Sequence, residues 1–165
     1  MCGICGEFKF TNDNFDEIKL KNLMDSISSR GKDSEGMYRD NHIFLGHRRL
    51  AIIDTSKKSN QPMHIEKYVI VFNGVIFNYH ELKRDLLKKG HVFKSDGDTE
   101  VLLRAYIEYG QECVKYLDGV FAFCIYDTNN KKRGLNNILI KLDNLEKKQK
   151  TIGNFYLIKN SSKIL

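Results

Sequence analysis

A series of short apolar segments constrains the fold of this chain more than any other feature of its sequence. Four of them follow one another at 36–39, 42–47, 50–53 and 68–73, and residues 55–61 form a polar loop between the last two. Segments of this length, bounded by glycine and polar residues, are typical of strands rather than helices. Because the connections are short, we expect these strands to form an antiparallel sheet.

The flanking segments complete an α+β pattern. Residues 2–10 alternate weakly and contain two glycines, which predicts a first strand. The segment VFAFCIYD at 120–127 is apolar enough for a central strand buried on both faces. Helices are predicted at three places, each followed by a glycine that ends it: 15–27, 79–89 and 99–109. The fold class is therefore α+β, and the number of strands favours a second sheet.

The composition of the chain changes near residue 128. Residues 131–165 hold nine Lys+Arg and two Asp+Glu, whereas residues 1–130 hold 18 and 19. The formal charge of +6 therefore belongs to the C-terminal segment, and we expect no nucleic-acid partner. We expect one domain over 1–128, incomplete at its C-terminus, and a lysine- and asparagine-rich tail over 129–165. This tail should be poorly ordered or hold a loosely attached helix around 136–150.

The cysteines indicate the compartment. Four are present, too few and too scattered for a secreted disulfide framework, so we expect free thiols: Cys2, Cys5, Cys113 and Cys124. The sequence shows neither a signal-like N-terminus nor an apolar run long enough to cross a membrane. These features predict a cytoplasmic protein without a membrane partner.

Cys2 stands out because its side chain is small enough for the initiator Met1 to be removed before it. A free α-amine with a pKa of about 7.7–8.0 could then take the proton of the neighbouring thiol, so that nucleophile and base share one residue. Two alternatives remain open: an unremarkable second residue, and a C-x-x-C pair with Cys5 for redox chemistry or zinc. A zinc site would need a second such pair, so no metal site is expected.

A set of motifs gives the chain a family resemblance. They are MCGI at the start, RGKDSEG at 30–36, LGHRRLAIID at 45–54, QPM at 61–63, NGVIFNY at 73–79, SDGDTEV at 95–101 and DGVFAFCIYD at 118–127. In this order the motifs resemble the class II glutamine amidotransferases, and most closely the asparagine synthetases. The resemblance implies an N-terminal nucleophile hydrolase fold, a four-layer sandwich with two antiparallel sheets between helical layers.

The resemblance also implies catalytic roles for three residues. Cys2 would attack the side-chain amide of glutamine, release ammonia and leave a thioester that water hydrolyses. Asn73 and Gly74 match the oxyanion hole, where an amide and a backbone N–H face the developing negative charge. From the residues alone, Asn-Gly would equally predict a tight hairpin turn.

Substrate-binding roles follow from the same resemblance. Arg49 matches the arginine that binds the α-carboxylate of glutamine, and the backbone of Ile52 and Ile53 would line the same pocket. Asp98 matches the carboxylate that holds the α-ammonium group, although an N-cap of the following helix is the alternative. Val75 stands where the family usually has glutamate, which predicts weaker glutamine binding. Arg48 is expected to be solvated.

Three residues of the RGKDSEG motif resemble a structural loop beneath the pocket: Arg30, Asp33 and Gly36. The S-G-G-x-D-S loop of the family's ATP-using synthetase domain does not occur in this sequence. ATP and Mg are therefore expected only for a synthetase domain or subunit that would act as partner, and no cofactor for this domain. The expected reaction is glutamine hydrolysis to glutamate and ammonia. A catalytically inactive glutamine-binding or regulatory remnant is the alternative, and the abrupt change at 129 resembles a frame shift or premature end.

Overall fold

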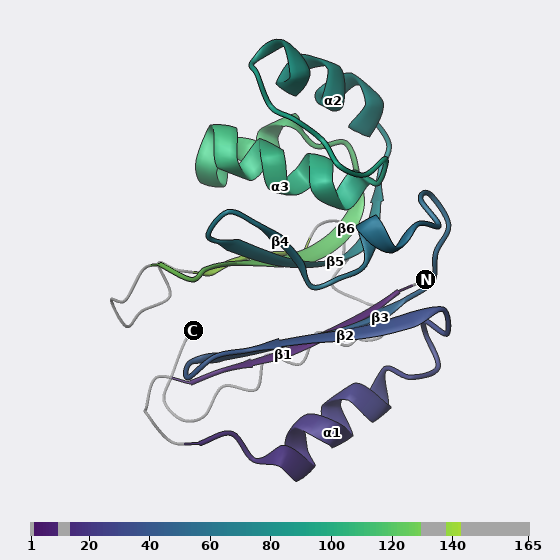
Figure 1. Cartoon of the computed structure of the whole chain (residues 1–165), viewed down its shortest axis with the longest axis vertical. Helices are drawn as coiled ribbons and strands as arrows, with labels where there is room; N and C mark the ends of the chain where they lie inside the picture. Colours follow the sequence, from purple (N-terminus) through teal and green to yellow (C-terminus); the bar gives the residue numbers. More distant parts are fainter. Residues whose placement is uncertain (1, 10–13, 130–137, 143–165) are drawn as a thin grey trace.

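The chain forms four layers, a helix, two stacked sheets and a pair of helices (Figure 1). The computed structural model describes residues 2–9, 14–129 and 138–142, the last segment for its backbone alone. Both sheets are antiparallel. The chain is therefore an α+β four-layer sandwich, as the sequence predicted.

The first sheet has the strand order β1-β3-β2. Its strands are β1 (Gly3–Phe8), β2 (Ser34–Arg39) and β3 (Ile43–Arg49). Helix α1 (Glu17–Ser26) covers its outer face, and the Asp16 side chain caps this helix by accepting from the amides of Ile18 and Lys19.

The second sheet has the strand order β4-β5-β6-β7. Its strands are β4 (Met63–Ile65), β5 (Tyr68–Ile76), β6 (Gly119–Asp127) and β7 (Ile138–Leu142). Helices α2 (Tyr79–Lys88) and α3 (Asp98–Tyr109) cover its outer face (Figure 1). Two 3₁₀ segments complete the fold, η1 (Lys57–Ser59) and η2 (Gly110–Tyr116).

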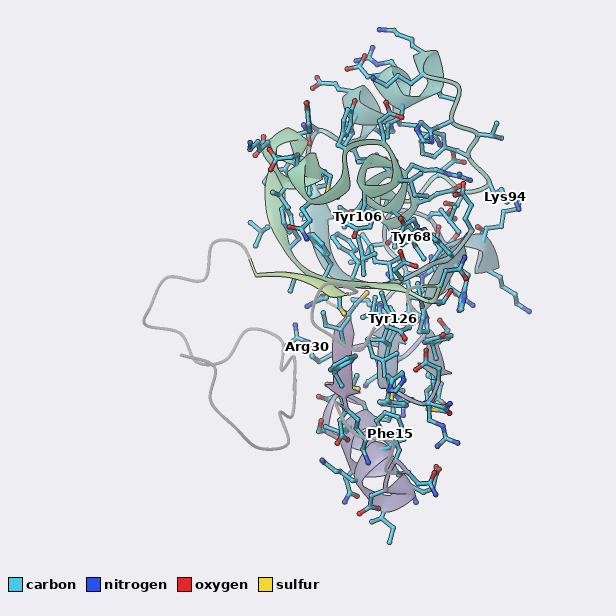
Figure 2. The ribbon with its side chains drawn as sticks, turned by 90° about the vertical axis from the view of Figure 1, so that its left-hand side faces the viewer. Phe15, Arg30, Tyr68, Lys94, Tyr106 and Tyr126 are labelled. Atoms are coloured by element: carbon cyan, nitrogen blue, oxygen red, sulfur yellow. The ribbon has the colours of Figure 1, made fainter. Side chains whose placement is uncertain are left out.

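Alternation along the strands divides the apolar side chains among three cores. On β5, Val69 and Val71 point between the sheets, whereas Ile70 and Phe72 point toward α2 and α3. This is the two-residue period of a strand buried on both faces. Figure 2 labels aromatic residues from all three cores: Tyr126 between the sheets, Tyr106 of α3 with Tyr68 of β5, and Phe15 beside α1.

Several predicted elements are confirmed. The helices at 79–89 and 99–109 are present as α2 and α3, and each ends at a glycine with positive φ, +93° at Gly90 and +59° at Gly110. The strand at 120–127 is the central strand β6, buried over most of its length, with Val120 51% exposed.

The strand predicted at 50–53 is wrong, because the chain bends after β3. The backbone amides there bind side chains instead of a neighbouring strand: Leu50 N–H donates to Cys2 Sγ at 3.3 Å, and Ala51 N–H donates to Asp33 at 2.7 Å. Gly31 does not end α1 either, since the helix finishes at Ser26. A Cβ on Gly31 would lie 2.5 Å from the backbone of Arg48, so this glycine permits close packing against β3.

The helix predicted around 136–150 is wrong where the structure describes that segment. Residues 138–142 form β7, which pairs with β6 in the register Ala122↔Leu142 to Tyr126↔Ile138. Isolated Ile and Leu residues gave no period in the sequence, and pairing with β6 supplies the order that the local pattern lacked. The remainder of the predicted tail, 130–137 and 143–165, lies outside the described residues.

Among the helices that the structure describes, none combines the length and the apolar character that crossing a bilayer requires.

Candidate active site

A cavity of about 310 Å³ opens at one end of the stacked sheets. Residues from the start of β1, the loop after β3, the middle of β5 and the start of α3 line it. All eight residues that the sequence singled out lie in its wall: Cys2, Arg49, Ile52, Ile53, Asn73, Gly74, Val75 and Asp98. The tertiary fold therefore brings together groups that span almost a hundred positions of the chain.

The thiol of Cys2 is held at the cavity by the backbone around it. Its Sγ accepts the Leu50 N–H at 3.3 Å and lies 3.5 Å from the Leu50 carbonyl oxygen. The Cys2 carbonyl oxygen accepts a 2.8 Å bond from Arg30 Nε. Cys2 is half-buried, so its sulfur is fixed in position and still reaches the cavity.

Cys5 does not share this environment, which removes the C-x-x-C alternative. It is fully buried beside α1, and its Sγ lies 3.7 Å from the Met24 sulfur. Burial raises the pKa of the Cys5 thiol to about 12, so it stays protonated. Cys113 and Cys124 are free thiols, as predicted, and both are buried in the core. Within the described ranges, no three His, Cys, Asp or Glu side chains cluster as metal ligands would.

Arg49 carries a buried positive charge without a negative partner. It is only 7% exposed, and its guanidinium donates to the Asp54 carbonyl, to the Ser56 carbonyl at 2.8 Å and to Asn60 Oδ1 at 2.7 Å. All three acceptors are neutral, and no carboxylate of the described chain pairs with Arg49. A buried unpaired cation is costly, so a ligand carboxylate in the cavity would be stabilised there.

Arg48 points to the opposite face of β3. It forms an ion pair with Glu35 and is only partly exposed. The expectation that Arg48 is solvated is therefore wrong, because the strand alternation directs it against its neighbour on β2. The same alternation assigns Arg49, and not Arg48, to the cavity.

Asn73 and Gly74 lie inside β5 and not in a hairpin turn. They pair with Ala122 and Phe121 of β6. A Cβ on Gly74, whose φ is +156°, would lie 2.6 Å from the Cα of Phe121, so a glycine is required at this close approach. The side-chain amide of Asn73 forms no hydrogen bond with any described residue and lines the cavity, where it is free to donate.

Two buried polar side chains fix the backbone just before Asn73. The Phe72 amide donates to Gln61 Oε1 at 2.6 Å, and the Phe72 carbonyl lies 3.2 Å from His47 Nε2. Burial lowers the pKa of His47 to about 4, and the charge of Arg49 acts in the same direction. His47 is therefore neutral at physiological pH and donates its Nε2 hydrogen to Phe72.

Asp98 begins α3 directly after the capping position, which is Gly97. Its Oδ2 accepts the Ile76 amide at 3.2 Å, and the residue is 6% exposed. Burial raises the pKa of Asp98, while the hydrogen bonds from Ile76 and Thr99 oppose the rise. A cationic group beside it would stabilise the ionised form. Val75, next to Ile76, adds no charge to this wall of the cavity.

Ile52 and Ile53 line the cavity at its open side. Ile52 is 72% exposed and Ile53 38%, and both belong to the bend after β3. Of the RGKDSEG segment expected as a structural loop, only residues 30–33 precede β2, and Gly36 lies within that strand. Asp33 holds the Ala51 amide. Arg30, Asp33 and Gly36 are absent from the cavity wall, in agreement with a supporting position.

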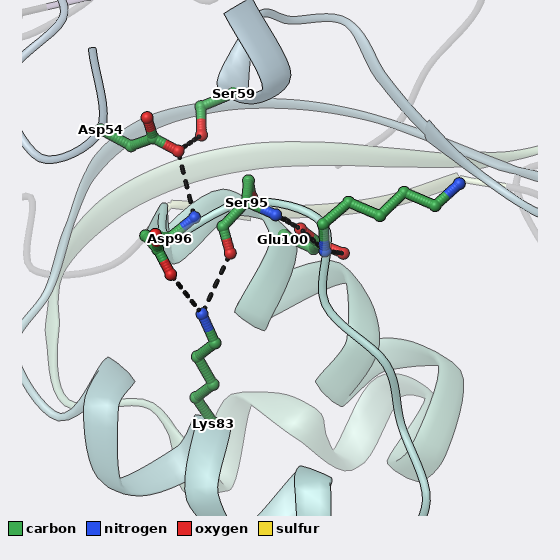
Figure 3. Close-up of polar contacts among 7 residues, drawn as sticks. Asp54, Ser59, Lys83, Ser95, Asp96 and Glu100 are labelled. Carbon is green, nitrogen blue, oxygen red and sulfur yellow. Dashed lines mark hydrogen bonds and ion pairs between the residues drawn. The ribbon is translucent and has the colours of Figure 1, made fainter. Parts of the chain in front are cut away.

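Asp54 connects the loop after β3 to the segment before α3 (Figure 3). Its carboxylate accepts from the Ser56 amide at 2.8 Å, Ser59 Oγ at 2.6 Å and the Asp96 amide at 3.1 Å. Burial alone would raise the pKa of Asp54, but these hydrogen bonds hold it well below its usual range. The carboxylate is therefore ionised throughout the neutral pH range.

The sequence profile of the family described as "Glutamine amidotransferase domain" matches residues 1–140. The chain belongs to this family.

Known relatives of this glutamine amidotransferase domain are longer proteins. Asparagine synthetase (glutamine-hydrolyzing) 1 of Bacillus subtilis is 44% identical over 137 residues, covering 79% of this chain and 21% of the relative. Asparagine synthetase (glutamine-hydrolyzing) 3 of the same organism is 38% identical over 140 residues, covering 82% and 22%. The chain thus spans about a fifth of the length of these relatives.

Among solved structures, the glutamine phosphoribosylpyrophosphate amidotransferase of Bacillus subtilis, complexed with ADP and GMP, superposes with a TM-score of 0.46. It is 26% identical over 52% of this chain and 21% of its own length.

Three residues of the amidotransferase site escaped the sequence reasoning: His47, Asp54 and Gln61. His47 lies within the GHRR motif of β3 and received no role, whereas it is fully buried and bonded to the Phe72 carbonyl. Gln61 and Asp54 were quoted in motifs but given no role. One signal was present, since each is a polar residue inside or beside an apolar strand, where an unsatisfied polar group would be costly.

Proposed function

We propose that this amidotransferase domain hydrolyses glutamine to glutamate and ammonia through a thioester on Cys2. The observation that carries the proposal is one cavity lined by a positioned thiol and by a buried arginine without a carboxylate partner. A thiol provides the nucleophile for acyl transfer, and the arginine provides the site for the α-carboxylate of the substrate.

The head group of glutamine would be held at both of its charges. Arg49 uses both Nη1 hydrogens and one Nη2 hydrogen on the loop. The Nε edge of the guanidinium is left to donate two parallel bonds to the α-carboxylate. The α-ammonium group would lie against Asp98. Val75 contributes no second carboxylate. Asp54 is the other carboxylate of the described cavity wall, but three hydrogen bonds engage it, so Asp98 would carry this interaction.

The chemistry proceeds in two steps. Removal of Met1 would free the α-amine of Cys2, which takes the thiol proton as the sulfur attacks the amide carbon of glutamine. The oxygen that becomes negative is stabilised by the Asn73 amide and the Gly74 N–H, each contributing about 3 kcal/mol in such sites. The amine returns the proton to the leaving nitrogen, ammonia departs, and a glutamyl thioester remains. Water then attacks the thioester and restores the thiol.

Every step above uses groups of this chain, glutamine and water. The relatives are named asparagine synthetases, so we propose that the ammonia serves a synthetase domain or subunit. ATP and Mg would belong to that partner.

The change Cys2→Ala tests the proposal. It should lower glutaminase activity about 1000-fold or more, because the nucleophile is lost. It should also abolish labelling by a glutamine analogue that carries a diazoketone in place of the amide, measured by peptide mass spectrometry. Cys5→Ala is the matched control, since Cys5 is buried beside α1 and should leave labelling intact. Activity that survives Cys2→Ala, or Met1 retained on the active protein, would contradict the mechanism.

A further inference from the structure

The two charged groups proposed to hold the amino acid head group belong to separate segments. Arg49 ends β3, and its guanidinium donates into the loop 54–60. Asp98 begins α3 and follows the segment 94–97. Their separation therefore depends on how these two segments are joined, and not on either element alone.

Asp54 contacts both segments. Its backbone carbonyl accepts a bond from the Arg49 guanidinium, so it is fixed to the first charged group directly. Its carboxylate accepts the Asp96 amide at 3.1 Å, two residues before Asp98. Gly97 lies between Asp96 and Asp98. A Cβ at this position would approach Ser59 Oγ to 2.7 Å, so the loop 54–60 and the segment 94–97 pack closely here.

The segment before α3 is itself held firmly on its far side (Figure 3). Lys83 of α2 donates to the Ser95 carbonyl at 3.0 Å and to the Asp96 carboxylate at 2.9 Å. The Glu100 carboxylate accepts the Ser95 amide at 2.7 Å, the Ser95 hydroxyl at 2.6 Å and the Lys94 amide. Asp54 therefore joins the segment that holds the Arg49 guanidinium to the anchored segment before α3.

We propose that Asp54 is a positioning residue that sets the separation of Arg49 and Asp98, and thereby makes the cavity selective for a free α-amino acid. This inference rests on the proposed function. A carboxylate is required because three donors converge on it, and an amide would present its own hydrogens to at least one of them.

The change Asp54→Asn tests the proposal in the full chain. It should raise the KM for glutamine about tenfold or more while kcat changes less than about threefold, because head-group binding is loosened and the thiol is untouched. The preference for glutamine over glutaramate, which lacks the α-ammonium group, should fall by about the same factor. The buried bond between Gln61 and Thr99, 3.2 Å long, remains in this variant and keeps the segments together.

Asp96→Asn is the matched control. It makes the same chemical change in the segment that Asp54 binds, but the Asp96 side chain is 93% exposed, so its ion pair with Lys83 contributes little to stability. Lys83 keeps its bond to the Ser95 carbonyl in this variant, and the segment stays anchored. Its KM and its preference for glutamine should match those of the unchanged chain. If Asp54→Asn fails to fold, Ser59→Ala removes one of the three bonds to Asp54 and should shift both quantities in the same direction by a smaller factor.

The outcomes separate the two proposals. The unchanged chain could hydrolyse glutamine while Asp54→Asn and Asp96→Asn have equal KM values. This result overturns the role of Asp54 and leaves the glutaminase proposal standing. A parallel loss for glutamine and glutaramate in Asp54→Asn also overturns it, because a purely structural defect acts on both substrates. An unchanged chain that neither hydrolyses nor binds glutamine overturns both proposals.

Discussion

Acid should destabilise this protein through His47. The ring is fully buried between the sheets, and burial lowers its pKa from 6.5 to about 4. In the unfolded chain His47 takes up a proton near pH 6.5, whereas in the folded protein it stays neutral down to about pH 4. The unfolded state therefore binds more protons in this window, so the free energy of unfolding falls as the pH falls from about 7 to about 4 and is unaffected by His47 below that.

The size of this effect follows from the shift. Each pKa unit corresponds to about 1.4 kcal/mol, so the full window is worth about 3 kcal/mol, of which about 2 kcal/mol is lost between about pH 7 and about pH 5. The chain has no tryptophan, so urea unfolding is best followed by far-UV circular dichroism at these two pH values.

The matched variant for this measurement is His47→Gln. Glutamine does not titrate, and its side-chain amide keeps a donor for the Phe72 carbonyl. The change in unfolding free energy between the two pH values should be smaller by about 2 kcal/mol in His47→Gln, whatever its absolute stability. Carboxylates and the other histidines titrate in both proteins and cancel in the difference. If the unfolding free energy depends on pH equally in the two proteins, His47 is not buried in its neutral form.

Two further predictions concern the substrate site, and steady-state glutaminase kinetics tests both. Arg49→Lys should raise the KM for glutamine about 100-fold, because lysine cannot hold the loop and a carboxylate at once. Arg48→Lys, on the opposite face of β3, is its control, and an unchanged KM for Arg49→Lys would contradict the role of Arg49. Val75→Glu should lower the KM about tenfold by adding a second carboxylate for the α-ammonium group. Val75→Gln is the control, because glutamine has nearly the shape of glutamate without its charge. Equal KM values in Val75→Glu and Val75→Gln would exclude an effect of the charge.

Local sequence patterns were sufficient to predict those helices and strands whose conformation depends on their own residues. Alternating apolar residues in β5 and β6 require a two-residue period, and the glycines after α2 and α3 supply the positive φ that ends a helix. The motif order in turn located eight residues of the cavity wall, although their separate roles stay predictions. Asn73 and Gly74 show the limit, since the same dipeptide predicts a turn when its partner strand is unknown.

The sequence by itself determined the fold class and the ends of α2 and α3, because periodicity and backbone preference are local properties. Only the tertiary structure decided that residues 50–53 bend to meet Cys2, that residues 138–142 pair with β6, and that Asp54 reaches Asp96. Each of these contacts joins residues far apart in sequence, 48 positions for Leu50 and Cys2 and 42 for Asp54 and Asp96. Such contacts form only when the tertiary fold brings the segments together, and no local pattern encodes that proximity.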